Sequence, residues 1–283
     1  MTQPTIEMTE GADGTPLAVY DFGGDGVPVL FVHATGFCAE TWAPVIDRVP
    51  GIRAVALDVR YHGRSGRGPD DGFSWDTVAG DVAAAIDHFD LESAVGVGHS
   101  MGGALLVLTE ADRPGTFRGI WGYEPINFPP ALAAMAEDGG NPLAVGAARR
   151  RATFESREAA RSNFASKPPM SVFDPAALDA YLDGGFSTGA DGSVTLRCAP
   201  ADESRFYLMG SKHHGWDRLP DLGCPMWVAA GNEGYGPAAM APEIANRLTD
   251  GRLVEHPSLG HFGPMQDPAA IAAEIQQFLV AVG

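Results

Sequence analysis

The stretch "SAVGVGHSMGGALLVLTEA" (residues 93–111) decides the fold of this chain. Its first half is an apolar run typical of a buried strand, and its second half is a helix that follows without a loop. Ser100 lies at the junction, with Gly98 and Gly102 two places away on either side. Gly-x-Ser-x-Gly between a strand and a helix forms a sharp turn that exposes the serine. We therefore predict a nucleophilic serine at the carboxyl edge of a parallel sheet.

Strand and helix patterns alternate on both sides of this stretch. Residues 5–23 predict two strands joined by the turn at 12–15, because Asp-Gly favours a tight hairpin. Further strands are expected at 27–34, 52–59, 117–125, 224–231 and 251–258, and helices at 39–49, 76–90, 241–248 and 267–282. Such alternation indicates a mostly parallel sheet with helices on both faces.

The alternation is interrupted after Glu124. Residues 126–216 are expected to be mainly helical or irregular and to form a cap inserted into the main domain. The α/β core would then comprise residues 1–125 and 217–283. Both ends of the sequence would belong to the core.

Composition limits the partners. The chain of 283 residues has 19 Lys and Arg against 36 Asp and Glu, a formal net charge of −17. This charge argues against nucleic acid and anionic membrane partners and leaves a small-molecule substrate. Cys38, Cys198 and Cys224 have neither disulfide nor zinc spacing, which favours a cytoplasmic setting. No secretory signal, membrane span, metal site or cofactor motif is visible, and we expect no cofactor and a monomer or homodimer.

A serine hydroxyl needs a base to remove its proton. Of the eight histidines, His261 in "PSLGHFGPMQDP" has the strongest claim, because it follows the last expected strand. The carboxyl ends of parallel strands meet in one crevice, where Ser100 is also expected. The alternative is that His261 only packs in its loop.

Four motifs resemble the α/β-hydrolase family across nearly the whole chain: "VHATGF" (32–37), "LDVRYHGRS" (57–65), "GHSMGG" (98–103) and "LGHFGP" (259–264). The resemblance implies an α/β-hydrolase fold and an oxyanion hole formed by the backbone N–H groups of Met101 and Thr35. Ala34 replaces the glycine that family members often have before the second donor. His33 would brace this loop by hydrogen bonds.

The acid of the triad has two candidates. In most of the family it follows the strand after the cap, commonly three residues after a glycine, but here that position is Gly234. Glu233 is one place earlier. Glu124 ends the strand before the cap, where haloalkane dehalogenases and a zearalenone-type lactonase, which the chain resembles here, carry a glutamate. We favour Glu124; because those dehalogenases use an aspartate nucleophile, Ser100 argues against dehalogenation.

The chain has two basic segments. Arg60, Arg64 and Arg67 beside His62 resemble a structural turn of the family, and the alternative is an anion site. The run Arg149–Arg151 in the expected cap is predicted to face water.

The cap is rich in Phe, Met and Pro, which predicts a largely apolar pocket. Alternatively, these side chains form the small hydrophobic core of the cap itself. The expected substrate contacts are Phe37, His99, Phe128 and Phe262, with pocket lining from residues 126–130, Met135, Phe154, Phe164 and 206–209.

The sequence and the family resemblance leave three alternative functions. The first is a serine hydrolase that cleaves a carboxylic ester or lactone of a small to medium, largely apolar substrate through an acyl-enzyme. The second uses the same triad for C–C bond hydrolysis or as a cofactor-free perhydrolase. The third is a ligand-binding protein on this fold with little turnover.

Overall fold

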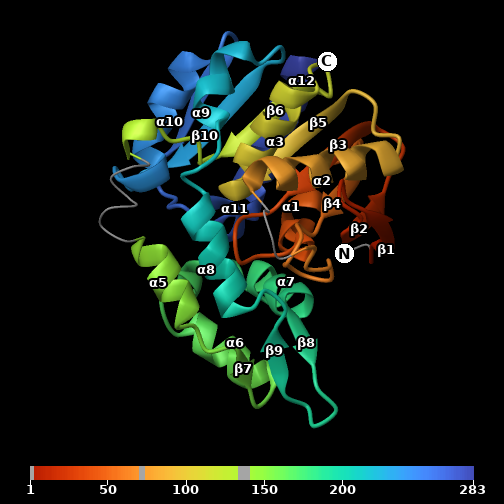
Figure 1. The fold of residues 1–283 in the computed structure, drawn as a ribbon, viewed down its shortest axis with the longest axis vertical. Helices are drawn as coiled ribbons and strands as arrows, with labels where there is room; N and C mark the ends of the chain where they lie inside the picture. Colours follow the sequence, from red (N-terminus) through yellow and green to blue (C-terminus); the bar gives the residue numbers. More distant parts are fainter. Residues whose placement is uncertain (1–2, 70–73, 133–140) are drawn as a thin grey trace.

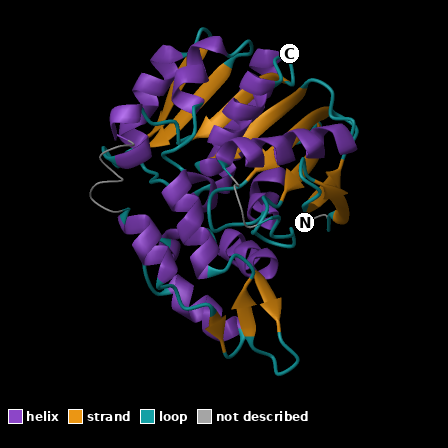
Figure 2. Ribbon diagram, in the orientation of Figure 1, coloured by secondary structure: helices purple, strands orange, loops and turns teal. Residues whose placement is uncertain are grey.

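The structure is a computed structural model that describes residues 3–69, 74–132 and 141–283. Its centre is an eight-stranded sheet with strand order β1-β2-β4-β3-β5-β6-β10-β11 (Figures 1 and 2). Strands β3 to β11 of this sheet are parallel, and β2 pairs antiparallel with both β1 and β4. The strands are β1 (Thr5–Glu10), β2 (Pro16–Gly23), β3 (Val27–Val32), β4 (Ile52–Leu57), β5 (Ala94–His99), β6 (Phe117–Tyr123), β10 (Met226–Gly231) and β11 (Gly251–His256). The predicted hairpin and mostly parallel sheet are confirmed.

Helices cover both faces of the sheet. On one face, side chains of α2 (Trp75–His88), α3 (Met101–Asp112), α9 (Gly215–Arg218) and α10 (Gly236–Arg247) form one core cluster. On the other face, α1 (Ala43–Ile46) and α12 (Pro268–Val282) form a second cluster. Alternate residues of β2 divide between them: Leu17 and Val19 enter the first cluster, and Ala18 and Tyr20 the second.

The expected helix at 39–49 is shorter than predicted. A 3-10 turn, η1 (Ala39–Trp42), leads into α1, which has a single turn. Trp42 and Val45 are still buried against the sheet, so the apolar spacing was correct although the helix length was not.

The segment between β6 and β10 lies beyond the carboxyl ends of the parallel strands, in green and teal in Figure 1. Its main helices are α5 (Pro142–Ala148), α6 (Arg157–Ala165), α7 (Pro175–Gly185) and α8 (Pro200–Met209), with the short turns η2 (Met170–Val172) and η3 (Leu219–Asp221). It also contains a three-stranded sheet that was not predicted: β7 (Thr153–Phe154), β8 (Phe186–Thr188) and β9 (Val194–Leu196). These strands have two or three residues each, too few for a periodic signal. We call residues 126–216 the insertion and propose it as the cap.

The insertion has its own apolar cluster, which includes Phe154, Tyr181 and Phe186. Phe37 and Met265 of the main domain join the same cluster, so the insertion packs on the edge where the parallel strands end. This contact encloses the space above that edge.

Candidate active site

Ser100 lies between β5 and α3 in a strained backbone conformation. Its φ of 56° and ψ of −113° are unusual for a residue with a side chain, and such strain costs about 1–3 kcal/mol. The turn is held from both sides: the Ser100 N–H donates to the Tyr123 carbonyl over 2.9 Å, and the Ser100 carbonyl accepts from Ile126 N–H over 3.2 Å. The serine therefore stands in a fixed position at the ends of β5 and β6.

The two flanking glycines are required by packing. A Cβ at Gly98 would overlap the backbone of Gly102, and a Cβ at Gly102 would overlap the carbonyl oxygen of Val32 at the end of β3. The close approach brings the start of α3 against the loop that follows β3. Glycine permits it because it has no side chain.

His261 forms a hydrogen bond with Glu124. The imidazole Nδ1 and the carboxylate Oε2 are 2.6 Å apart, and Glu124 is completely buried. The other carboxylate oxygen accepts from Gly231 N–H over 2.9 Å, and the Glu124 backbone N–H donates to Ala229 O over 2.8 Å. Glu124 is thereby held at the end of β6 by the neighbouring strand β10. This bond gives the imidazole a fixed orientation.

Ser100 and His261 line one cavity of about 640 Å³. Glu233 lines it too, and a Cβ at Gly260 would meet the Glu233 carboxylate. The other lining residues come from both the main domain and the insertion: Ala34, Thr35, Trp75, Ile126, Asn141, Leu143, Pro168, Pro169, Val172, Tyr207, Gly210, Ser211, Tyr235, Gly236, Pro237, Phe262 and Gln266.

Thr35 and Met101 lie next to each other. The Thr35 hydroxyl donates to the Met101 sulfur over 3.4 Å. Met101 is the first residue of α3, so its N–H has no partner within the helix and lies at the positive end of the helix dipole. These are the positions expected for two oxyanion donors.

Histidines brace the loop that carries Thr35, as predicted for His33. The His33 ring bonds Ala34 O through Nδ1 over 2.8 Å and accepts from Val59 N–H through Nε2 over 3.0 Å. His62 Nε2 accepts from Gly36 N–H over 3.0 Å. Burial keeps the pKa of His33 well below its usual value and lowers that of His62 to about 4, so both rings are neutral acceptors.

Three of the four expected substrate contacts do not line this cavity. His99 is fully buried beneath it, and its Nε2 bonds the backbone carbonyl of His261 over 2.8 Å. Phe37 lines a neighbouring cavity instead, and half-buried Phe128 lines neither. Phe262 does line the catalytic cavity. Neighbouring residues in a chain can point to opposite sides of the backbone. The position of a residue in the sequence therefore does not decide whether its side chain faces the cavity.

The expected lining from the insertion is also partly corrected. Ile126 and Tyr207 line the catalytic cavity, whereas Phe206 is buried in the core against His62. Phe154 and Phe164 line the neighbouring cavity. Met135 lies outside the described residues.

Several lining residues were missed by the sequence analysis. Tyr235, Pro237 and Gln266 follow the carboxyl ends of β10 and β11, and Trp75 begins α2. The signal for the first three was available, because loops after parallel strands form the crevice of such sheets. Tyr235 is also an exposed aromatic side chain, as a ligand surface requires.

The basic segment after β4 is occupied by internal ion pairs. Arg60 is fully buried between Asp81 and Asp13, Arg67 pairs with Asp202, and Arg64 lies near Glu40. The structural interpretation of this segment accounts for its charges, and the anion-site alternative is not supported.

The family to which the chain belongs follows from a comparison with family models. The model of the Alpha/beta hydrolase family matches residues 29–274, and the chain belongs to that family. The chain is 26% identical to a putative non-heme bromoperoxidase BpoC of Mycobacterium tuberculosis, over 93% of this chain and 97% of that protein. It is 42% identical to a non-heme chloroperoxidase of Streptomyces lividans, but over only 32% of this chain and 34% of that relative.

Solved structures share the fold. An E-2-(acetamidomethylene)succinate hydrolase superimposes with a TM-score of 0.79 at 22% identity, covering 98% of this chain and all of the other. A thermophilic esterase from Thermogutta terrifontis gives a TM-score of 0.70 at 21% identity, covering 99% of each chain. No helix in the described ranges has both the length and the apolarity to cross a bilayer.

Proposed function

We propose that the protein is a serine hydrolase that cleaves a carboxylic ester or lactone of a small to medium, largely apolar substrate. The observation that carries this proposal is the 2.6 Å hydrogen bond between His261 and buried Glu124, in a cavity that Ser100 also lines. The apolar side chains of Ile126, Tyr235 and Phe262 in the same cavity suit an apolar substrate.

In the proposed mechanism, Ser100 Oγ attacks the carbonyl carbon while His261 Nε2 takes its proton. Glu124 accepts the hydrogen bond of Nδ1 and stabilises the imidazolium. The Thr35 and Met101 N–H groups bind the oxyanion, and one such donor contributes on the order of 3 kcal/mol. His261 then protonates the leaving alcohol, an acyl group stays on Ser100, and water activated by His261 releases the acid.

The test is labelling with a fluorophosphonate probe, together with turnover of short p-nitrophenyl esters. The wild type should be labelled and should turn over, and Ser100→Ala should do neither. Turnover that survives in Ser100→Ala would refute the mechanism. A wild type that neither labels nor turns over would favour the alternative of a ligand-binding protein.

A second candidate is a cofactor-free perhydrolase with the same three residues. Its support is the non-heme haloperoxidase names of the relatives above. Hydrogen peroxide would replace water as the attacking group on the acyl-enzyme and release a peracid. The test supplies p-nitrophenyl acetate and hydrogen peroxide to the wild type and to Ser100→Ala. Peracetic acid that forms only with the wild type would favour this function, and acetic acid as the sole product would count against it.

A further inference from the structure

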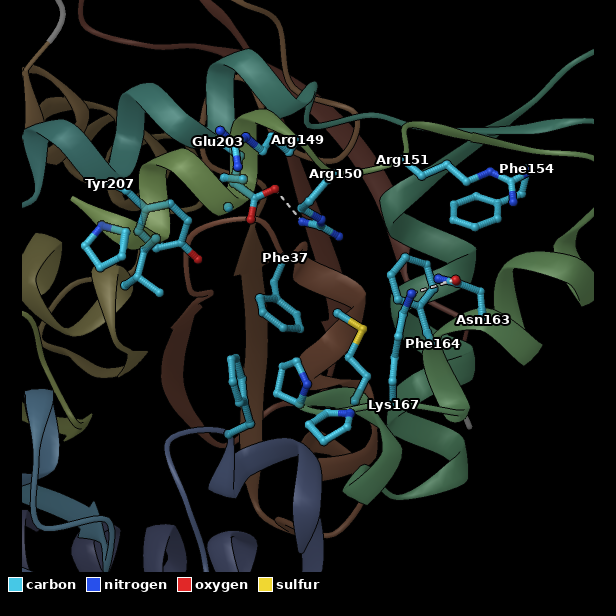
Figure 3. A pocket seen from close by; sticks show the side chains of 18 residues that line it. Phe37, Arg149, Arg150, Arg151, Phe154, Asn163, Phe164, Lys167, Glu203 and Tyr207 are labelled. Atoms are coloured by element: carbon cyan, nitrogen blue, oxygen red, sulfur yellow. Dashed lines mark hydrogen bonds and ion pairs between the residues drawn. The ribbon is translucent and has the colours of Figure 1, made fainter. Parts of the chain in front are cut away.

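A second cavity of about 600 Å³ borders the catalytic one (Figure 3). The two cavities have five lining residues in common: Leu143, Pro168, Pro169, Tyr207 and Phe262. The Phe262 ring lies 5.1 Å from the His261 ring and 5.6 Å from the Phe37 ring, measured between centroids. A single aromatic ring therefore separates the catalytic imidazole from the second cavity.

The interior of this second cavity is apolar. Phe37 of the main domain lines it, together with Phe154, Phe164 and Met170 of the insertion. An arm of the substrate that passes Phe262 would find aromatic and aliphatic contacts there.

Basic side chains gather around the same cavity in a chain whose net charge is −17. Arg149, Arg150, Arg151 and Lys167 all line it, and among the residues that the structure describes the only acidic one in the lining is Glu203. In Figure 3, Arg149 and Arg150 lie on one side of Phe37 and Lys167 lies beside Phe164.

Two of these cations are already neutralised. Arg150 pairs with Glu203 and donates to the Tyr181 hydroxyl over 2.8 Å, and Arg151 pairs with Glu155. Arg150 is therefore turned inward, which corrects the expectation that the whole run faces water. Its side chain is only 22% exposed.

Two cations remain without a carboxylate partner in the part of the chain that the structure describes. The Lys167 ammonium donates to the neutral Asn163 amide oxygen over 2.9 Å, and Arg149 forms no ion pair there. Both side chains belong to exposed residues, so they stand at the solvent side of an apolar cavity. An anion at this place would be paired without displacing an existing ion pair.

We propose that the second cavity binds a carboxylate at the end of an apolar arm of the substrate, so that preferred substrates are esters with a negative charge remote from the scissile bond. This inference rests on the proposed function, because it needs Ser100 to attack the ester. Arg149 or Lys167 pairs with the carboxylate, and Phe37, Phe164 and Phe262 hold the arm. A carboxylate with a cationic partner forms charge-assisted hydrogen bonds, which are stronger than neutral ones.

The experiment compares anionic esters with neutral forms that differ from them by one methyl group. One set is the mono-p-nitrophenyl esters of dicarboxylic acids with four to eight carbons, against their methyl-capped forms. The other set is the acetate of a carboxylate-bearing nitrophenol, against its methyl ester. We expect at least one anionic member to exceed its neutral partner in kcat/KM by about tenfold or more. The double variant Arg149→Gln/Lys167→Gln should lower this ratio by a similar factor, and added salt should lower it too.

The matched control is Arg157→Gln. Arg157 lies on α6 with Phe164, but it is paired with Asp183 over 2.7 Å and does not line the cavity. This variant should keep the wild-type ratio. Turnover without an anionic preference in either set, or a ratio unchanged in the double variant, would overturn the inference and leave the proposed function standing. Absence of fluorophosphonate labelling would instead remove the proposed function, and the inference with it.

Discussion

At the scale of single residues, the unusual feature is the source of the carboxylate. Glu124 comes from the strand before the insertion, and its φ of 45° turns it back toward His261. Gly231 N–H, at the end of β10, occupies its second oxygen. Both oxygens thus have partners, so a completely buried carboxylate is not left unsatisfied.

This geometry makes a prediction about two glutamates. Glu124→Gln should lower kcat by about four orders of magnitude. Gly231 N–H would hold the amide oxygen, so the NH₂ group would face Nδ1, where it cannot accept a hydrogen bond and leaves His261 in the wrong tautomer. Steady-state kinetics on a p-nitrophenyl ester measures it.

Glu233→Gln is the control, since Glu233 lines the same cavity while the Nδ1 partner is Glu124. It should keep most of the activity. The reverse ranking would sink the assignment of the acid.

At the scale of elements, the elbow depends on how closely α3 approaches β3. Gly102 is the point of contact, because any Cβ there would overlap the Val32 carbonyl oxygen. That carbonyl belongs to rigid backbone in the middle of the sheet, so it cannot move aside as a flexible side chain would. The same contact keeps Met101 next to Thr35.

We therefore expect Gly102→Ala to destabilise the protein by about 1–3 kcal/mol or more, by overpacking. It should also lower kcat, because the first turn of α3 would move away from the Thr35 loop. Urea unfolding and ester turnover give the two readouts.

Gly146→Ala is the matched control. Gly146 lies in α5 with open space around it, so alanine should stabilise by about 0.5–1 kcal/mol. Equal stability changes in the two variants would contradict the argument.

At the scale of the whole molecule, buried histidines join the sheet to the loops above it. His62 illustrates the consequence: folding lowers its pKa from 6.5 to about 4, because burial disfavours the charged ring. Between these values the unfolded chain binds more protons than the folded one. Stability from this group is therefore present above pH 6.5 and is lost as the pH falls toward 4.

The prediction concerns the difference in unfolding free energy between wild type and His62→Gln. When the pH falls from 7 to 4, the wild type should lose about 3 kcal/mol more unfolding free energy than the variant, because only the wild type has this buried ring. Urea unfolding across this range measures it. Taking a difference cancels groups that do not interact with His62. Buried Asp58, whose raised pKa of about 7 acts in the opposite direction, is present in both proteins.

A flat difference for His62→Gln would show that the buried ring does not titrate as described.

Much of the fold followed from local patterns. The strand, elbow and helix at 93–111 are contiguous, and the apolar spacing of 76–90 and 267–282 predicted α2 and α12 because each buries one face on the sheet. The short strands β7, β8 and β9 and the single turn of α1 were missed, since packing and not periodicity stabilises such brief elements.

The sequence by itself determined that Ser100 stands at a strained turn and that His261 follows the last strand, because both depend on neighbours along the chain. Only the tertiary structure decided which carboxylate meets His261, since that depends on β6 lying beside β10. It also decided that Arg150 turns inward and that His99 is buried below the cavity. The direction of each of these side chains depends on elements that are distant in the sequence but close in space. Local sequence patterns do not show which distant elements come together.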